Sequence, residues 1–292
     1  MRLKLSHLQA VFLMVGVAFL WATAGVVTRH LQFAARFEVT FWRAVFCAGS
    51  LGLALGWSQG RGLVRRIAGA GATFWYSAFC WAVMFTAYMV ALTMTRVGNV
   101  LVTMAIGPLL TALFSWIGLG HRVLPRTWAA IVVAGIGIAY MYAAQIGQVS
   151  LLATLVALCV PVAGALNWTV TQHAHDQGHG VDLVAAVLVG SVLCSLVTLA
   201  LAWPLQSSLH DVELLGGLGI FQLALPCALC VQCARVLRAP EMSLLQLLEV
   251  IFGILLAWLG ANEVPTPAVL TGGALVITAL LVNEWLRWRT AK

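Results

Sequence analysis

The sequence predicts an all-α membrane protein built from ten transmembrane helices. Hydrophobic residues make up 62% of the 292 residues and charged residues only 9%. A soluble domain is instead about half apolar and about a quarter charged. Apolar stretches of about twenty residues recur along the whole chain, which is the length that crosses a bilayer core. In addition, two distant stretches resemble each other at a constant spacing, which is typical of an internal duplication.

The first half of the chain contains five predicted spans. The N-terminal 25 residues have the basic start and the Ala22-x-Ala24 pattern of a secretory signal, but the apolar run is too long for one, so an uncleaved helix is expected. The other four spans are expected at 37–57, 73–94, 97–119 and 125–144. Pro108 follows Gly107 inside the fourth span and removes a backbone hydrogen bond, which predicts a bent helix with free carbonyls. A kink that only serves packing is the alternative.

The second half restarts the pattern after residue 148. Its spans are expected at 149–171, 181–203, 213–236, 239–265 and 264–285. Pro240 and Glu241 are typical of a helix start. Glu249 lies near the middle of the ninth span, where an ionised carboxylate costs roughly 3 kcal/mol or more unless it is paired, protonated or facing water. Glu249 is therefore the leading candidate for a functional residue.

Residues 99–125 match the ninth predicted span at a constant offset of 142 residues. At this offset three residues are identical, namely Leu113 with Leu255, Trp116 with Trp258 and Gly118 with Gly260. Five spans per half would bring the second half into the membrane from the opposite side, as in an inverted repeat. We therefore expect two five-helix repeats, residues 1–146 and 147–292, within one membrane domain.

Basic residues are distributed unevenly between the two sides of the predicted bundle. Twelve lie on one side: Arg2, Lys4, Arg61, Arg65, Arg66, Arg122, Arg126, Arg235, Arg238, Arg287, Arg289 and Lys292. The other side carries Arg29, Arg36 and Arg96. By the positive-inside rule both termini should be cytoplasmic, in a multi-pass protein of the inner membrane. The basic residues form short runs beside apolar segments and no basic stripe, so nucleic acid is not an expected partner.

Four stretches carry a resemblance to a known family. They read FLWATAGVV at 19–27, FWRAVF at 41–46, MAIGPLLTALFSWIGLGHRVL at 104–124 and SLLQLLEVIFGILLAWLGANEVPT at 243–266. They are similar to the ten-helix EamA branch of the drug/metabolite transporter superfamily, whose members export small metabolites. The resemblance implies alternating access around a central cavity, lined mainly by the first, third, fourth, sixth, eighth and ninth helices. Within that branch, the closest functional analogue is the exporter of aromatic and other neutral amino acids.

The chain departs from the family pattern at two places. The family usually has an acidic residue after the glycine that ends the fourth helix, where this chain has His121. It usually has a proline in the ninth helix, where this chain has Glu249 followed by Val250. A role for the first acidic residue is therefore in doubt, whereas Glu263 keeps the counterpart of that residue in the second half.

Two charged side chains inside predicted spans are the main candidates for a binding site. Glu249 can hold the ammonium group of an amino acid or carry a proton whose binding alternates with substrate. Arg43 can bind a carboxylate through two parallel hydrogen bonds. The two residues can instead form a structural ion pair with each other, and Arg43 can also snorkel to the interface. Gln246, one turn before Glu249, extends a polar track or joins helices by hydrogen bonds.

Further candidates are polar and aromatic residues within the spans. The polar ones can orient a substrate or bind a neighbouring helix, and they are Asn99, Thr103, Asn167 and Gln222. The aromatic ones can contact an aromatic ring or a cation, or simply pack in the core, and they are Trp21, Trp81, Phe85, Tyr88 and Trp168.

Two patterns resemble metal motifs, but neither predicts a metal site. His173, His175, Asp176 and His179 have suitable ligand chemistry, yet they fall in a short polar loop, which favours solvated side chains. Cys227, Cys230 and Cys233 are spaced along one face of a predicted helix, where cysteines pack as small hydrophobes. No cofactor and no metal is expected.

Three classes of function remain open. The preferred one is a secondary transporter that exports a small polar metabolite, with amino acids as the first candidate and another metabolite or a drug-like cation as the alternative. A membrane-embedded enzyme is disfavoured because the sequence has no nucleotide-binding loop, no HExxH helix and no nucleophile elbow. A passive channel or scaffold should tolerate changes at Glu249 and Arg43. The expected partners are a small-molecule substrate and the lipid bilayer, with protons as a further candidate and a monomer as the favoured state.

Overall fold

The computed structural model describes residues 5–32, 35–60, 62–120, 124–144, 150–177, 182–233, 236–237 and 245–290. Within these ranges all regular secondary structure is helical. The helices of the first half are α1 (His7–Thr28), α2 (Arg36–Gln59), α3 (Gly62–Ala68), α4 (Ala72–Met94), α5 (Val97–Met104), α6 (Gly107–Leu119) and α7 (Pro125–Ala143). Those of the second half are α8 (Leu151–Asp176), α9 (Leu183–Ala202), α10 (Leu209–Gly217), η1 (Leu218–Ala224), α11 (Leu225–Cys233), α13 (Leu248–Ala261) and α14 (Pro267–Thr290).

The helices have the length and apolarity of a polytopic membrane protein. In the described ranges, seven helical segments are long and apolar enough to cross a bilayer: His7–Thr28, Arg36–Gln59, Ala72–Met94, Val97–Gly118, Leu151–Thr171, Leu183–Ala202 and Leu209–Cys233. Three shorter apolar helices, Pro125–Met141, Leu248–Ala261 and Pro267–Asn283, lie at the positions of the remaining predicted spans. The predicted class, an all-α membrane protein, is confirmed.

Several elements differ from the expected boundaries. Helix α3 was not predicted, and it inserts a short basic helix between the second and third spans. The fourth span breaks at Ala105 and Ile106, just before Pro108, as the proline predicted. The eighth span begins at Leu209, four residues earlier than expected, because the hydroxyl of Ser208 caps α10 by accepting the Asp211 N–H. The predicted helix start at Pro240 and Glu241 lies outside the described residues.

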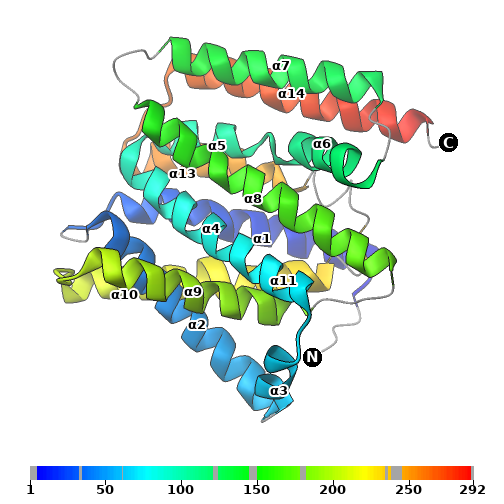
Figure 1. Cartoon of the computed structure of the whole chain (residues 1–292). Helices are drawn as coiled ribbons and strands as arrows, with labels where there is room; N and C mark the ends of the chain where they lie inside the picture. The colour runs from blue at the N-terminus through cyan, green and yellow to red at the C-terminus, as the bar shows by residue number, and fades with distance from the viewer. Residues whose placement is uncertain are drawn as a thin grey trace.

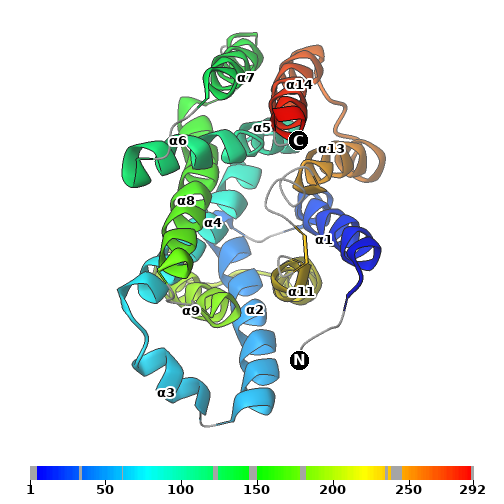
Figure 2. The same ribbon diagram turned by 90° about the vertical axis from the view of Figure 1, so that its right-hand side faces the viewer.

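The long helices run side by side, with α7 and α14 together along one edge of the bundle (Figure 1). Helix α1 begins and α14 ends at the same end of the bundle, on the right in Figure 1. The opposite end carries residues 29–32, 95–96, 203–208 and 262–266 (Figure 1). In Figure 2, which is turned by 90°, α1 and α13 lie on one side of the bundle and α8 and α9 on the other.

Each half packs extensively against the other. Helix α1 contacts α13 and α11, whereas α8 contacts α4, α5 and α6. Helix α2 packs on α9, and α7 packs on α14. The largest buried cluster takes residues from both halves, including Met89, Leu101, Leu215 and Val250. The core therefore lies between the halves rather than within either one.

The ends of corresponding helices have similar local structure. Gly120 caps the C-terminus of α6 and Asn262 caps that of α13, and both capping residues are left-handed, with φ of 69° and 54°. Helices α7 and α14 both begin with a proline, Pro125 and Pro267. In each case the two positions are separated by 142 residues, the offset found in the sequence. A left-handed C-cap and an N-terminal proline are favourable helix boundaries, so these ends are fixed locally.

Candidate substrate site

Arg43 is buried in α2 and is held by a glutamine from the other half. Its exposed fraction is 2%. Its Nε donates a 2.9 Å hydrogen bond to Oε1 of Gln222, whose Nε2 donates to the main-chain carbonyl of Trp21 at 3.1 Å. The guanidinium carbon lies 5.8 Å from the ring centre of Phe85 and 5.6 Å from that of Tyr88. Arg43 is thus the point where α1, α2, α4 and η1 meet.

A stretch of π-helix brings Gln222 to Arg43. Pro226 has no N–H, so the carbonyl of Gln222 loses its usual α-helical donor. Over η1 the hydrogen bonds span five residues, as in that from the Leu225 N–H to the Ile220 carbonyl. Gly219 permits the close approach to α2, because a Cβ atom there would lie 2.6 Å from the Arg43 carbonyl oxygen. Single turns of π-helix are frequent at functional sites.

Three of the predicted side chains bury polar atoms that lack a partner among the described residues. These atoms are Nε1 of Trp81, the hydroxyl of Tyr88, and both amide atoms of Asn167. Trp81 lies 5.4 Å from Phe85 and, edge to face, 6.2 Å from Trp168, measured between ring centres. An unsatisfied buried polar group costs about 1–3 kcal/mol. A polar ligand or water that supplied the missing hydrogen bonds would remove this cost.

Glu249 lies partly buried in the first turn of α13, near the same centre. It is close enough to Arg43 and Tyr88 to interact with both electrostatically. Among the described residues, however, Arg43 and Glu249 form no ion pair. The ion pair that the described residues do form joins Arg29 to Glu263. The structural Arg43–Glu249 ion pair considered from the sequence is therefore absent, and the two charges remain separate.

Two other candidates make hydrogen bonds to groups four residues away in the sequence. Asn99 and Thr103 are fully buried in α5. The amide of Asn99 donates to Oγ1 of Thr95 at 3.0 Å, and the hydroxyl of Thr103 donates to the Asn99 carbonyl at 2.7 Å. Both contacts are local in the sequence.

The remaining candidates lie around the helix breaks. Pro108 is in the first turn of α6, and its missing N–H leaves the Met104 carbonyl without its usual donor. Gln246 is partly buried just before Leu247, where a turn precedes α13. Trp21 contributes its carbonyl to Gln222, while its ring packs against a buried cluster that includes Cys47 and Phe85.

The sequence patterns that resembled metal motifs bring no ligand set together in the described residues. No group of three or more His, Cys, Asp or Glu side chains there could hold a metal ion. His173 is exposed and bonds to Gln177. The side chains of His175 and Asp176, and all of His179, lie outside the described residues. Cys230 and Cys233 pack against Met14 and Val17 of α1.

Sequence reasoning missed two of the carboxylates that gather at one end of the bundle, and it noted the third, Glu263, only as the counterpart of a family residue. Glu38 and Asp211 are fully buried there, and Glu263 pairs with Arg29 at 2.9 Å. Glu38 and Asp211 both lie in the first turn of a helix, where acidic residues commonly stabilise the helix dipole. A position in the first turn of a helix gives no reason to expect contacts between the halves.

An all-helical membrane protein with a buried centre of charged, polar and aromatic side chains has the architecture of a membrane transporter. The sequence profile of the EamA-like transporter family matches residues 8–143 and again residues 151–284, and the chain belongs to this family. It is thus a multi-pass membrane transporter of the drug/metabolite transporter superfamily and not an enzyme.

Comparison with solved structures shows the same fold. One crystal structure is 18% identical to the chain, with a TM-score of 0.65, and the match covers 98% of this chain and 100% of the other. At this level of identity the likeness concerns the fold alone. The comparison with curated proteins gave no match.

Proposed function

We propose that the protein is a secondary transporter that exports neutral amino acids, aromatic ones among them, by alternating access. The observation that carries this proposal is the pair of unpaired opposite charges, Arg43 and Glu249, beside buried aromatic rings. A neutral amino acid carries one carboxylate, one ammonium group and an uncharged side chain. Its three parts match the three kinds of group at the site.

Arg43 is suited to the substrate carboxylate. Gln222 already occupies Nε, which fixes the guanidinium and leaves the two terminal nitrogens for a ligand. Those nitrogens can donate two parallel bonds to one carboxylate. Because the site is buried, the bonds would be stronger there than in water.

Glu249 is suited to the ammonium group or to a proton. An acidic side chain at membrane depth needs a cation, water or its own protonation for compensation. No described residue forms an ion pair with it, so its compensation would alternate between substrate and proton. Exchange of this kind couples export to a proton gradient.

The aromatic residues are suited to the substrate side chain. Trp81, Phe85, Tyr88 and Trp168 would provide apolar ring faces. The Trp81 N–H, the Tyr88 hydroxyl and the Asn167 amide would gain the hydrogen bonds that they lack. Binding sites for small molecules commonly combine such apolar walls with a few placed polar groups.

Alternating access is supported by signs of an inverted repeat of ten spans. The family profile matches each half separately, which agrees with repeats at 1–146 and 147–292. The helix contacts also come in matching sets: α1 with α13 corresponds to α8 with α6, and α4 with α8 corresponds to α1 with α11. Inverted repeats of this kind exchange two conformations around a site at their interface.

Orientation follows from the basic residues. Arg65 and Arg66 lie on α3, and Arg126 lies at the start of α7, on the side where α1 begins. The positive-inside rule makes this side cytoplasmic in the inner membrane. Export would then proceed toward the end that carries residues 29–32 and 262–266.

A second candidate substrate is a drug-like cation. Glu249 and the aromatic rings would bind an amine that has no carboxylate, through ionic and cation–π contacts. The two candidates differ in their use of Arg43.

A flux assay in proteoliposomes tests the proposal with three labelled compounds of matched side chain. These are phenylalanine, phenethylamine, which lacks the carboxylate, and phenylpropionate, which lacks the ammonium group. We expect phenylalanine to move fastest. Faster movement of the amine would favour the cation, whereas no flux of any of the three would overturn the amino-acid proposal.

A further inference from the structure

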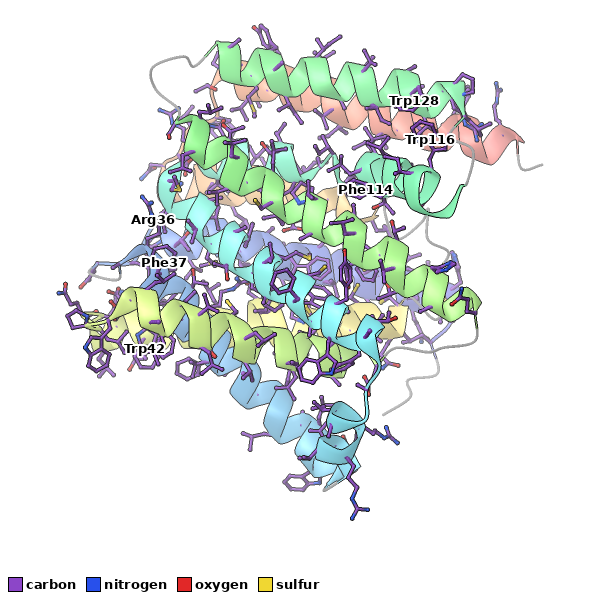
Figure 3. The ribbon with its side chains drawn as sticks, in the orientation of Figure 1. Arg36, Phe37, Trp42, Phe114, Trp116 and Trp128 are labelled. Carbon is purple, nitrogen blue, oxygen red and sulfur yellow. The ribbon has the colours of Figure 1, made fainter. Side chains whose placement is uncertain are left out.

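Two fully buried carboxylates at one end of the bundle bind the backbone of the opposite half. Glu38 of α2 accepts the Gln206 N–H at 2.9 and 3.0 Å and the Ser207 N–H at 2.6 Å. It also accepts a 3.4 Å bond from Nε1 of Trp42, which lies at this end of the molecule (Figure 3). In the reverse direction, Asp211 of α10 accepts the Gln32 N–H at 2.8 Å.

A third carboxylate at the same end joins the halves through an ion pair. Glu263, between α13 and α14, accepts Nε of Arg29 at 2.9 Å and the Val97 N–H at 2.8 Å. Arg29 also donates to the carbonyls of Leu92 and Thr95, each at 2.7 Å. The pair is partly buried, with exposed fractions of 28% for Arg29 and 14% for Glu263.

The ion pair lies across the junction of two helices. Arg29 binds carbonyls at the C-terminus of α4, and Glu263 binds the first N–H of α5. Cations are favourable at helix C-termini and anions at helix N-termini. The charges therefore stabilise both helix ends while they fix the end of α1 to the start of the α13–α14 connection.

At the opposite end, the described bonds between the halves include two that end on uncharged acceptors. There the hydroxyl of Thr127 donates to Oδ1 of Asn283, and Arg126 donates to the Leu286 carbonyl. No carboxylate of the described residues crosses between the halves at that end. The sequence agrees, because the position that corresponds to Glu263 is His121 in the first half.

We propose that Glu38, Asp211 and Glu263, the carboxylate seam, form a gate that closes one end of the transport pathway and opens in each cycle. This inference rests on the proposed alternating access, in which the halves must separate at each end in turn. The bonds of Glu38 to the 206–207 backbone, of Asp211 to Gln32, and of Glu263 to Arg29 and Val97 all cross between the halves, so separation breaks them. While these bonds are intact, the end that carries the seam is closed.

Distances between spin labels on the two halves test the gate without any substrate. His30→Cys in the first half and Trp203→Cys in the second are exposed positions at this end, and the exposed Cys159 is replaced by Ser. The seam is weakened by Glu263→Gln or Asp211→Asn. The matched control is Glu213→Gln, an exposed carboxylate on the same helix as Asp211.

We expect one dominant short distance in the parent protein. A charged hydrogen bond contributes enough that its loss should raise the ratio of long to short distances about tenfold. Arg29→Gln should give the same change as Glu263→Gln, and Glu213→Gln should give none.

Unchanged label distances in Glu263→Gln, Asp211→Asn and Arg29→Gln, together with a lowered melting temperature, would show that the seam is a static brace and would overturn the gate. Because the labels report conformation, a failure of amino-acid flux would leave this result standing. The two proposals are therefore tested independently.

Discussion

Gln222 and Arg43 are joined by a 2.9 Å hydrogen bond between the two halves of the chain. The bond depends on the π-helical stretch η1, which turns Gln222 toward α2, and on Gly219, which lets the two backbones approach. Arg43 is thereby fixed at the buried centre with its terminal nitrogens free of Gln222. The following predictions concern this centre and the packing around it.

Gln222→Glu should weaken substrate binding while the protein remains folded. The new carboxylate would keep the bond to Arg43 and neutralise the charge that the substrate carboxylate needs. We expect the KM for a neutral amino acid to rise at least tenfold in proteoliposomes. Gln59→Glu, at the exposed end of α2, is the matched control and should leave the KM unchanged.

Arg43→Lys should impair recognition of the substrate carboxylate in particular. Lysine keeps the charge but loses the planar fork that binds two oxygens. The measurement is the ratio of phenylalanine flux to phenethylamine flux, which should fall by tenfold or more. A ratio equal to that of the wild type would mean that Arg43 does not contact the carboxylate.

Pro108→Ala should slow transport without a loss of stability. Alanine restores an N–H to the break between α5 and α6 and favours a continuous helix. We expect an equal or higher melting temperature in detergent and a lower maximal flux. Pro125→Ala, at the start of α7, serves as the control because proline there is at a regular helix start. Unaltered flux in Pro108→Ala would assign the break to packing alone.

Gly272→Val should destabilise the contact between α7 and α14. A Cβ atom at Gly272 would lie 2.6 Å from the Gly137 carbonyl oxygen, which is closer than real contacts allow. The helices would have to separate, at a cost of about 1–3 kcal/mol. The melting temperature should fall, whereas Gly135→Ala, with nothing within 4 Å of its Cβ position, should not lower it.

Much of the fold could be predicted because the membrane restricts which segments can cross it. Apolar stretches of sufficient length identified the spans, and local residues identified several ends. The spans expected to end at 119 and to begin at 125 do so in the structure, where Gly120 is a left-handed cap and Pro125 starts the next helix. Pro108 likewise indicated the break in the fourth span.

The arrangement of the site could be predicted only in part. Arg43, Gln222, Tyr88 and Glu249 were all candidates, but which of them meet depends on how the helices face one another. Apolar periodicity does not distinguish hydrogen bonds that span four residues from those that span five, so η1 was not foreseen. Gly219 and Pro226 are the residues that permit it, yet both residue types are also common in ordinary membrane helices.

Two residues of the carboxylate seam were missed for a different reason. Glu38 and Asp211 satisfy a local rule, because each lies in the first turn of its helix. Their contacts with Gln206 and Gln32 join residues far apart in the sequence. No pattern within one segment could reveal these partners.

Flux through Glu249→Gln tests the central claim most directly. Wild type, Glu249→Gln and the control Glu213→Gln would be reconstituted in liposomes, and export of labelled phenylalanine would be measured at two pH values. We predict that the wild type and the control transport equally. In Glu249→Gln, the flux should fall at least tenfold or should no longer depend on pH. Equal flux and equal pH dependence in all three proteins would contradict a role for Glu249 in substrate binding or proton coupling.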